Sequence, residues 1–358
     1  MITISLCMIV KNEEEVLSRI LEPMSRIADE IIIVDTGSTD RTKELASRFT
    51  PYVYDFPWQQ DFAAARNYAC SKASKDYWMW LDADDMIAPG WQKELLNLKN
   101  DLEPDIDIVM MKYVTDFDEN GRPAFYYYRE RLIKNDRSHF WKGKVHEAVT
   151  PEGNVLYSPI EIEHRKTVCK DSDRNLKIYE MMIQNGEKLE PRHQYYYARE
   201  LYYHGRFNEA VQTFLNFLRE PDAWLENQID ACLMLSRCYE KMGKRQESLK
   251  ALFNSFLYDL PRAEISCEIG RLLMEKQAYR QAVYWFLQAL AAGEPDTSGA
   301  FIQKDYYDYI PNLQLCVCYD RLGERGKALE YHKRSMEAKP DSEAVKYNQI
   351  YFQKMSEG

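Results

Sequence analysis

The sequence predicts an α/β domain with a mainly parallel sheet over residues 1–170, followed by an all-α domain over residues 171–358. Two observations support this division. Up to about residue 115, short apolar segments alternate with helix-like segments, a rhythm typical of βαβ units. Beyond about residue 172 no β-rich segment remains, and a pattern typical of helix pairs recurs instead. A chain of 358 residues is long enough for two domains with cores of their own.

The N-terminal elements follow one another in a regular order. Apolar, often β-branched runs predict buried strands at 2–10, 31–34, 52–54, 78–81 and 106–113. The segments between them predict helices at 13–25, 39–49, 62–71 and 91–98. From residue 125 to about 164 the pattern changes to shorter strands and loops rich in Arg, Lys and aromatic residues.

Small residues recur at a constant offset in the C-terminal half. Ala210, Ser248, Ala282 and Ala328 each follow another small residue at the same distance, and they lie 38, 34 and 46 residues apart. A 34-residue unit with small residues at its helix contact resembles the tetratricopeptide repeat, which implies stacked helix pairs. The longest spacing predicts an insertion around residues 293–311, and residues 346–355 could cap the array. A helical domain without regular repeats is the alternative.

Composition and charge argue against several classes of protein. The formal net charge of −10 argues against broad nucleic-acid binding, although a local basic patch could remain. The eight cysteines form no CxxC pair, so we expect reduced core thiols and no zinc site. The apolar run at 2–10 is too short for a signal peptide, and no stretch approaches the about 20 residues of a membrane span. We therefore expect a soluble, cytoplasmic protein.

A cluster of carboxylates follows the predicted strand that ends at Leu81. Asp82, Asp84 and Asp85 are close enough to repel one another, and a divalent cation with oxygen ligands would relieve that repulsion. Asp35 stands at the end of an earlier predicted strand, where it could accept hydrogen bonds from a base or ribose. In open α/β sheets, ligands bind at the carboxyl ends of the strands. Since a diphosphate could bridge such a metal, these residues predict a nucleotide-diphosphate site.

Four segments in this order resemble family 2 glycosyltransferases: MIVKNE at 8–13, VDTGSTD at 34–40, DFAAARN at 61–67 and LDAD at 81–84. The resemblance covers about residues 1–165. It implies the GT-A fold, a nucleotide-sugar donor (usually a UDP-sugar), Mn²⁺ or Mg²⁺ as cofactor, and inversion at the anomeric carbon. A glycosyltransferase domain followed by tetratricopeptide-like repeats is also similar to bacterial peptide and bacteriocin S- or O-glycosyltransferases, a looser likeness that rests on architecture.

The resemblance implies roles for individual residues of the donor site. Asp84 would coordinate the metal, and Asp82 would hold the ribose or a metal-bound water. Asp85 would have a structural role or support the metal ligands. The remaining donor residues would contact the nucleobase or the diphosphate: Lys11, Asn12, Asp35, Arg66 and Asn67. An ion pair with Asp61 or Asp35 is the structural alternative for Arg66.

A later segment, WKGKVHEAV at 141–149, offers a catalytic base. Attack on the anomeric carbon requires a proton acceptor near the acceptor hydroxyl or thiol. Glu147 is the predicted base, although family members often carry Asp there, and His146 is the alternative. An ion pair of Glu147 with Lys142 or Lys144 is its structural alternative.

Further basic and imidazole groups could belong to the site. His164 could be the last metal ligand or a structural residue. Three cationic residues could contact phosphate or form a solvated face: Arg129, Arg131 and Lys134.

The sequence thus predicts a metal-dependent, inverting glycosyltransferase that moves a sugar from a nucleotide-sugar to a peptide or protein side chain. Two alternatives remain open: the same chemistry on a polysaccharide or lipid-linked acceptor, and an inactive transferase that serves as a binding scaffold. The helical repeats would recruit the acceptor and could form a homodimer. Tyrosines at 195–197, 202–203 and 306–309 are partly core residues at helical spacing and could partly line a peptide groove.

Overall fold

The computed structural model describes residues 1–165, 173–293 and 299–356. The chain divides into two compact units, Met1–Lys188 and Leu189–Gly358. The predicted boundary between residues 170 and 171 lies outside the described residues, as does Cys169. The helix that follows it in the chain, α5, belongs to the first unit.

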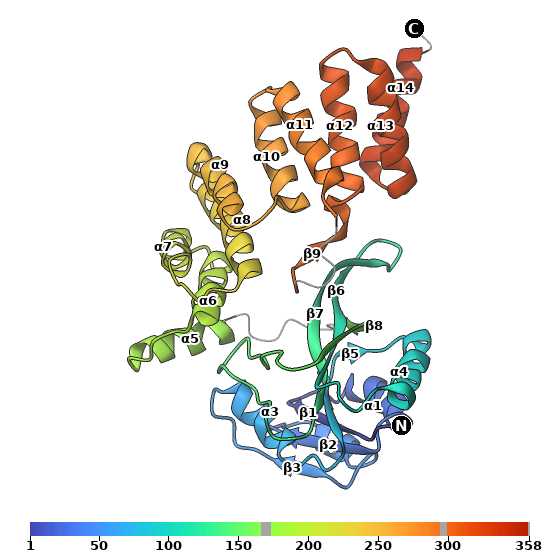
Figure 1. Ribbon diagram of the computed structural model, residues 1–358, viewed down its shortest axis with the longest axis vertical. Coiled ribbons are helices and arrows are strands. Elements are labelled where there is room, and N and C mark those ends of the chain that lie inside the picture. Colours follow the sequence, from blue (N-terminus) through green and yellow to red (C-terminus); the bar gives the residue numbers. More distant parts are fainter. Residues whose placement is uncertain (166–172, 294–298, 357–358) are drawn as a thin grey trace. The chain divides into compact units, whose positions relative to one another are not determined.

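The first unit is built on one sheet with the strand order β3-β2-β1-β4-β7-β6-β8-β5 (Figure 1). Strands β3, β2, β1 and β4 run parallel to one another, and β6 and β8 are also parallel. Strand β7 runs antiparallel to both β4 and β6, and β5 runs antiparallel to β8. The predicted α/β fold with a mainly parallel sheet is therefore confirmed, and the sheet also contains antiparallel pairs. The strand bounds are Ile4–Val10 (β1), Glu30–Asp35 (β2), Val53–Asp55 (β3), Tyr77–Trp80 (β4), Asp85–Met86 (β5), Ile108–Phe117 (β6), Pro123–Lys134 (β7) and Val155–His164 (β8).

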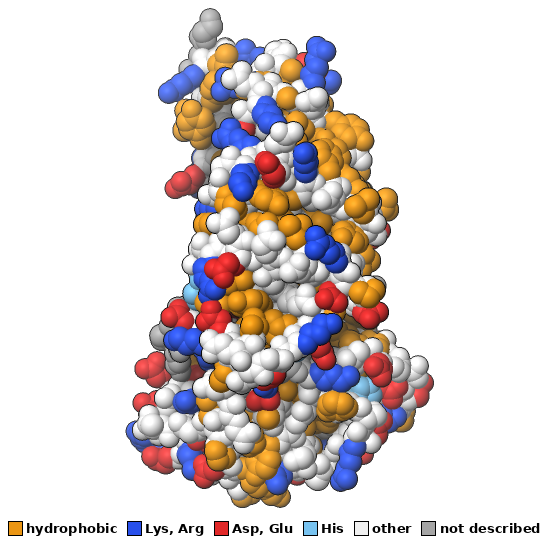
Figure 2. All heavy atoms as spheres, turned by 90° about the vertical axis from the view of Figure 1, so that its left-hand side faces the viewer, with side chains coloured by type: hydrophobic (Ala, Val, Ile, Leu, Met, Phe, Trp, Pro, Cys, Tyr) orange, Lys and Arg blue, Asp and Glu red, His pale blue; other side chains and the backbone are white. Residues whose placement is uncertain are grey.

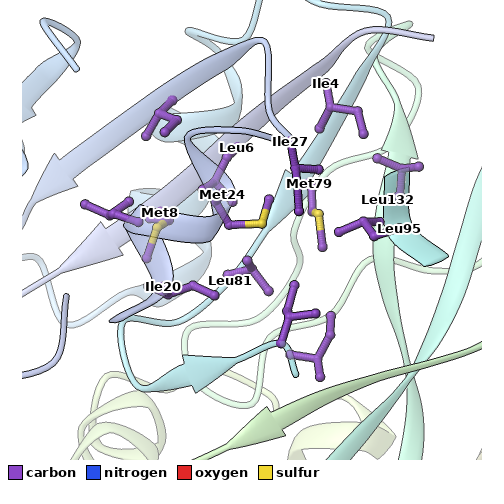
Figure 3. Close-up of a cluster of buried hydrophobic side chains, with 14 of the residues drawn as sticks. Ile4, Leu6, Met8, Ile20, Met24, Ile27, Met79, Leu81, Leu95 and Leu132 are labelled. Carbon is purple, nitrogen blue, oxygen red and sulfur yellow. The ribbon is translucent and has the colours of Figure 1, made fainter. Parts of the chain in front are cut away.

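Both faces of this sheet are covered by helices, which explains why β1, β2 and β4 are apolar almost throughout. One face packs on α1 and α4; its core is drawn in Figure 3, where Ile20 and Met24 of α1 lie close to Leu6 and Met8 of β1. The opposite face packs on α3. The helix bounds are Leu17–Met24 (α1), Thr42–Ala46 (α2), Phe62–Cys70 (α3), Pro89–Asp101 (α4) and Arg174–Gln184 (α5).

Asp61 fixes where α3 begins. Its carboxylate accepts a hydrogen bond from the backbone N–H of Ala64 at 2.8 Å, the geometry of a helix N-cap. Three small residues of α3, Ala63, Ala65 and Ala69, are buried and let the helix approach the sheet closely. The α3 helix thereby carries Arg66, the residue between them, into the interior at the carboxyl ends of the strands.

The prediction of shorter strands over 125–164 was wrong, whereas the loop between them, at 135–154, is present. Strand β7 is 12 residues long and β8 is 10 residues long. Strand β7 was not recognised because it contains charged residues that are buried. Arg129 and Arg131 point into the protein, where they form ion pairs with carboxylates and lie over the ring of Trp80. A pattern that treats charge as exposed cannot detect such a strand.

The second unit consists of antiparallel helix pairs (Figure 1). The small residues at the recurring positions, Ala210, Ser248, Ala282 and Ala328, are all fully buried. Four pairs are formed by Pro191–Tyr203 (α6) with Phe207–Phe217 (α7), Leu225–Lys241 (α8) with Arg245–Asn254 (α9), Ala263–Glu275 (α10) with Tyr279–Ala291 (α11), and Tyr309–Arg321 (α12) with Arg325–Ala338 (α13). The remaining elements are the 3₁₀ turns Ser255–Leu257 and Lys304–Tyr306, the short strand β9 at Ile302–Gln303, and α14 at Glu343–Ser356.

Gly270 shows why the contact between paired helices requires small residues. A Cβ atom at Gly270 would lie 2.7–2.9 Å from ring carbons of Phe286, closer than side chains tolerate. In the second pair, the hydroxyl oxygens of Ser236 and Ser248 lie 2.7 Å apart at the equivalent contact. The last helix covers the array, since Phe352 of α14 packs into the core of the preceding pairs.

Glu264 is a buried acid on α10. The backbone N–H of Gln303 and the hydroxyl of Tyr307 donate to its two carboxylate oxygens, each at 3.1 Å. Burial raises the pKa of Glu264 from 4.5 to about 7. Ionisation of Glu264 is therefore more favourable in the unfolded chain than in the folded one.

Replacing Glu264 with glutamine is expected to flatten the pH dependence of stability. Below its unfolded pKa Glu264 is protonated in both states, whereas between about pH 4.5 and 7 the unfolded chain ionises first and stability falls as the pH rises. The difference in unfolding free energy between Glu264→Gln and the wild type should therefore shift in favour of the variant by about 2 kcal/mol from pH 5 to pH 8. Urea unfolding at both pH values measures this, and identical pH profiles would contradict it.

Candidate active site

A cleft of about 640 Å³ opens at the carboxyl ends of β1 and β4 in the first unit. Most of the predicted site residues line it: Lys11, Asn12, Arg66, Asp82, Asp84, His146, Glu147 and His164. Asp35 and Asn67 are not among the lining residues. Residues from all parts of the first unit thus meet at one place, which is where open α/β sheets bind ligands.

Asp84, Asp85 and His164 form a group that could hold a metal ion. One ligand atom from each lies within 4.8 Å of the others. Asp84 and Asp85 follow β4, and β5 pairs with β8 so that Asp85 lies opposite His164 in the register. His164 Nδ1 is 3.4 Å from a carboxylate oxygen of Asp84 and 3.4 Å from one of Asp85. The pairing of two short strand segments that are far apart in the sequence therefore assembles the group.

The electrostatics of this group favour a bound cation. Burial and the neighbouring charges of Asp82 and Asp85 raise the pKa of Asp84. Burial opposes a charged His164, but the hydrogen bond with Asp85 and the charge of Asp84 outweigh it and raise the pKa of the imidazole. Two carboxylates and an imidazole are suitable ligands for Mn²⁺ or Mg²⁺, so the donor set fits the cofactor that the sequence implies.

Asp85 itself is committed to the surrounding structure. Its side chain is fully buried and forms an ion pair of 3.1 Å with Arg131, which is also fully buried. The hydroxyl of Tyr113 donates to Asp85 Oδ1 at 3.1 Å, and the backbone N–H of Asp82 donates to Oδ2 at 3.0 Å. Asp84 and His164, whose side chains are each about a quarter exposed, are the more accessible ligands.

Arg66 connects Asp82, which follows β4, with Glu147 of the later loop. Its Nη2 lies 2.8 Å from Asp82 Oδ1, and its Nε lies 2.7 Å from Glu147 Oε1. The guanidinium also lies 4.7 Å from the ring centre of Trp80 and 4.9 Å from that of Trp141. Burial opposes the charge, but Asp82 and Glu147 outweigh it and raise the pKa of Arg66. Among the described residues, Arg66 Nη1 has no hydrogen-bond partner although it is buried.

The alternative partners predicted for these charges were wrong. Arg66 pairs with Asp82 and Glu147 rather than with Asp61 or Asp35. Lys144, one predicted partner of Glu147, pairs instead with Glu187 at 2.6 Å. The Arg66 charge holds the pKa of Asp82 at about 2 although burial opposes this.

Asn67 is a structural residue in this arrangement. Its amide nitrogen donates to the backbone carbonyl of Trp141 at 2.9 Å, and its oxygen accepts from the backbone N–H of Trp141 at 2.8 Å. Asn67 therefore anchors the loop that leads to His146 and Glu147, while its neighbour Arg66 lines the cleft.

Asp35 is almost fully buried and directly precedes Thr36, which lines the cleft. Its Oδ1 accepts hydrogen bonds from the backbone N–H groups of Gly37 and Ser38, both at 2.9 Å. Its Oδ2 is buried and has no hydrogen-bond partner among the described residues. Gly37 has φ +103°, a conformation that favours glycine and that allows this tight turn. A ligand N–H could satisfy Asp35 Oδ2.

The loop that carries His146 contacts α5. His146 adopts φ +52°, which is uncommon for a residue with a side chain. Its ring stacks on Tyr179 with ring centres 6.2 Å apart and an angle of 13° between the planes, and its Nε2 lies 3.5 Å from Asn175 Nδ2. Backbone strain of this kind clusters at functional sites.

Several cleft residues were missed by sequence reasoning. Arg174 and Asn175 line the cleft from the start of α5, beyond the boundary that the sequence predicts. The aromatic lining, Trp58, Phe62, Trp80 and Tyr113, also has no local signal, since aromatic residues in these contexts are typical of any core. Of the three cationic residues with an open role, Arg129 lines the cleft, Arg131 pairs with Asp85, and Lys134 lies 3.7 Å from Asp107.

In the described ranges 1–165, 173–293 and 299–356, no helix is both long and apolar enough to cross a membrane.

Comparison with known proteins gives a family match within the first unit. Residues 5–152 match the family model described as Glycosyl transferase family 2. The SPbeta prophage-derived glycosyltransferase SunS of Bacillus subtilis (strain 168) is 25% identical over 253 residues, which cover 65% of this chain and 58% of SunS. The lipopolysaccharide core biosynthesis glycosyltransferase LpsC of Rhizobium meliloti is 27% identical over 161 residues, which cover 42% of this chain and 58% of LpsC.

A third relative has repeats in its name. The TPR repeat-containing protein Synpcc7942_0270 of Synechococcus elongatus is 42% identical over 92 residues, which cover 25% of this chain and 23% of that protein. The chain thus spans between about a quarter and three fifths of the length of these curated relatives. The predicted resemblance is confirmed: residues 5–152 match the glycosyl transferase family 2 model, and a tetratricopeptide-like helical region follows in the chain.

Proposed function

We propose that this protein is a metal-dependent, inverting glycosyltransferase that uses a UDP-sugar as donor. The observation that carries the proposal is the cleft in which Asp84 and His164 stand beside Asp82, Arg66 and Glu147. The match of residues 5–152 to the glycosyltransferase family supports it.

The donor site follows from the contacts of the cleft residues. Asp35 Oδ2 would accept the ring N–H of uracil, and Lys11 and Asn12 would border the same pocket. The unpaired Nη1 of Arg66 would donate to a diphosphate oxygen, since a guanidinium binds phosphate strongly. Asp84 and His164 would hold Mn²⁺ or Mg²⁺, which when bound stabilises the negative charge on the leaving diphosphate as a Lewis acid.

Glu147 would act as the base of a single displacement. The acceptor oxygen or sulfur forms a bond to the anomeric carbon, its proton passes to Glu147, and the bond from that carbon to the diphosphate oxygen breaks. Glu147 lines the cleft, and its ion pair with Arg66 fixes the position of the carboxylate. His146, held by Tyr179 and Asn175, is the second candidate for this role.

The acceptor we propose is a peptide or protein side chain that the helical repeats recruit. Stacked helix pairs provide extended binding surfaces, and this unit exposes hydrophobic side chains such as Leu257, Leu260 and Tyr284. Figure 2 shows hydrophobic side chains gathered between charged ones on one face of the helical unit. A saccharide acceptor is the second candidate, because LpsC is by its name an enzyme of lipopolysaccharide core biosynthesis.

A thermal-shift screen tests the donor site. UDP-glucose, UDP-GlcNAc, UDP-galactose, GDP-mannose and dTDP-sugars are each added with and without Mn²⁺. A ligand that binds only the folded state raises the unfolding midpoint by mass action. We expect a Mn²⁺-dependent rise with one of the UDP-sugars, whereas no shift with any donor would contradict the proposal and favour a binding scaffold.

A further inference from the structure

The phenol of Tyr113 lies between two of the residues that could hold a metal ion. Its hydroxyl oxygen is 2.9 Å from His164 Nδ1, and the hydroxyl donates to Asp85 Oδ1 at 3.1 Å. The strand register explains the contact with the imidazole. Tyr113 of β6 is paired with Ile162 of β8, and His164 follows two residues later on the same face of the sheet.

The ring of Tyr113 is held in place by its neighbours. It lines the cleft, yet its side chain is almost fully buried. The guanidinium of Arg131 lies 4.3 Å from the centre of the ring, and the ring of Tyr127 packs edge-on against it with 5.7 Å between the ring centres. Because the ring is fixed by this packing, its hydroxyl stays within hydrogen-bond distance of both His164 and Asp85.

The polar partners that the described residues offer to His164 Nδ1 are all oxygen atoms. Besides the Tyr113 hydroxyl, one carboxylate oxygen of Asp84 and one of Asp85 lie at 3.4 Å. An ionised carboxylate only accepts hydrogen bonds, so a lone pair on Nδ1 would face two acceptors. A proton on Nδ1 removes this conflict, and the Tyr113 oxygen is the one partner within the usual distance of about 2.7–3.2 Å for an N–H···O hydrogen bond.

The single proton of the Tyr113 hydroxyl fits this arrangement. The hydroxyl gives its proton to Asp85 Oδ1, which leaves the lone pairs of its oxygen to accept the N–H of His164. The other oxygen of Asp85, Oδ2, pairs with the buried guanidinium of Arg131 at 3.1 Å. The hydrogen bonds therefore run in one direction, from His164 through Tyr113 to Asp85, and the charge of Arg131 lies at the end of the chain of bonds.

We propose that Tyr113 is a positioning residue of the metal site, which holds the proton of the neutral His164 ring on Nδ1 and so leaves Nε2 as the atom that binds the metal ion. A neutral imidazole binds a metal through the nitrogen that carries no proton. A hydrogen bond from the other nitrogen fixes the orientation of the ring and makes it a stronger ligand. The inference rests on the proposed role of Asp84 and His164 in holding Mn²⁺ or Mg²⁺.

Nitrogen NMR of the metal-free full chain tests where the proton of His164 lies. The histidine rings are labelled with ¹⁵N, and the signals of His164 are identified by their loss in His164→Gln. At about pH 9, where histidine is neutral, we expect the wild type to show the Nδ1–H tautomer. Tyr113→Phe should allow the Nε2–H tautomer to appear, because the remaining oxygens at 3.4 Å are too distant for a good hydrogen bond.

Titration with Mn²⁺, followed by the electron paramagnetic resonance signal of the free ion, measures the consequence for the metal. It is carried out on the full chain with UDP and without it. Tyr113→Phe should weaken Mn²⁺ binding by about 10–100-fold, the usual effect of removing a partner behind a metal-binding histidine. Tyr77→Phe is the matched control, because Tyr77 is also buried and its hydroxyl donates to the backbone carbonyl of Ile106, away from the cleft. It should change neither the affinity nor the tautomer.

The outcomes separate this inference from the proposed function. An Nε2–H tautomer in the wild type would overturn the inference, and this result needs no variant. Mn²⁺ binding that is as tight in Tyr113→Phe as in the wild type would also overturn it, while the metal site itself would stand. A wild type that binds no Mn²⁺ under either condition would refute the metal role of Asp84 and His164 together with the inference.

Discussion

Replacing Asp84 with asparagine is expected to reduce Mn²⁺-dependent turnover of the sugar donor by about 10²–10³-fold, while the protein stays as stable as the wild type. The loss corresponds to several kcal/mol of charge stabilisation by the metal. Stability should be retained because burial, Asp82 and Asp85 raise the pKa of Asp84, so that its ionised form is unfavourable in the folded protein. Donor hydrolysis at saturating Mn²⁺ and the thermal midpoint measure the two effects.

Asp101→Asn serves as the control. Asp101 is exposed at the end of α4, so this substitution removes the same charge away from the site. It should leave both turnover and midpoint unchanged. Wild-type turnover in Asp84→Asn would refute the assignment of Asp84 to the metal. A large fall of its midpoint would show that the carboxylate is structural.

Replacing Asp85 with asparagine, unlike replacing Asp84, should lower stability. We expect the free energy of unfolding to fall by about 3–5 kcal/mol. The substitution leaves the guanidinium of Arg131 fully buried without its counterion. It also weakens the hydrogen bonds that Asp85 accepts from Tyr113 and from the backbone of Asp82. Urea unfolding of the full chain, followed by tryptophan fluorescence, gives the free energy; five of the seven tryptophans lie in the first unit and two in the second.

The double variant Asp85→Asn with Arg131→Met removes both charges and tests the cause. If the unpaired guanidinium is responsible, the double variant should recover much of the lost stability relative to Asp85→Asn alone. An Asp85→Asn variant within about 1 kcal/mol of the wild type would show that the ion pair is unimportant.

The parts of the fold that the sequence predicts well are those with a local cause. Strands β1, β2 and β4 are apolar because helices cover both faces of the sheet, and the repeats are visible because Ala210 and its equivalents must be small. Strand β7 escaped prediction because its cations have partners inside the protein. Its residue Arg131 pairs with Asp85, which lies 46 positions earlier in the chain.

The site was predicted as a set of residues but not as a network. The motifs nominated Arg66, Asp82 and Asp84, and the later segments nominated Glu147 and His164. All five line one cleft. The partner of Arg66, Glu147, lies 81 positions away, and only the folded chain brings the two together. The contribution of α5 had no signal, because nothing in the residues around Arg174 and Asn175 indicates that they face the cleft.

The fully buried pair of Asp85 and Arg131 also bears on how such a chain can diverge during evolution. In the roles that we propose, chemistry depends on the accessible Asp84, whereas folding depends on its neighbour Asp85. A descendant could therefore lose transfer by drift at one position and survive selection as a binding protein through its intact repeats. Among descendants that have lost catalysis, we expect Asp84 to vary freely and the pair of Asp85 and Arg131 to persist.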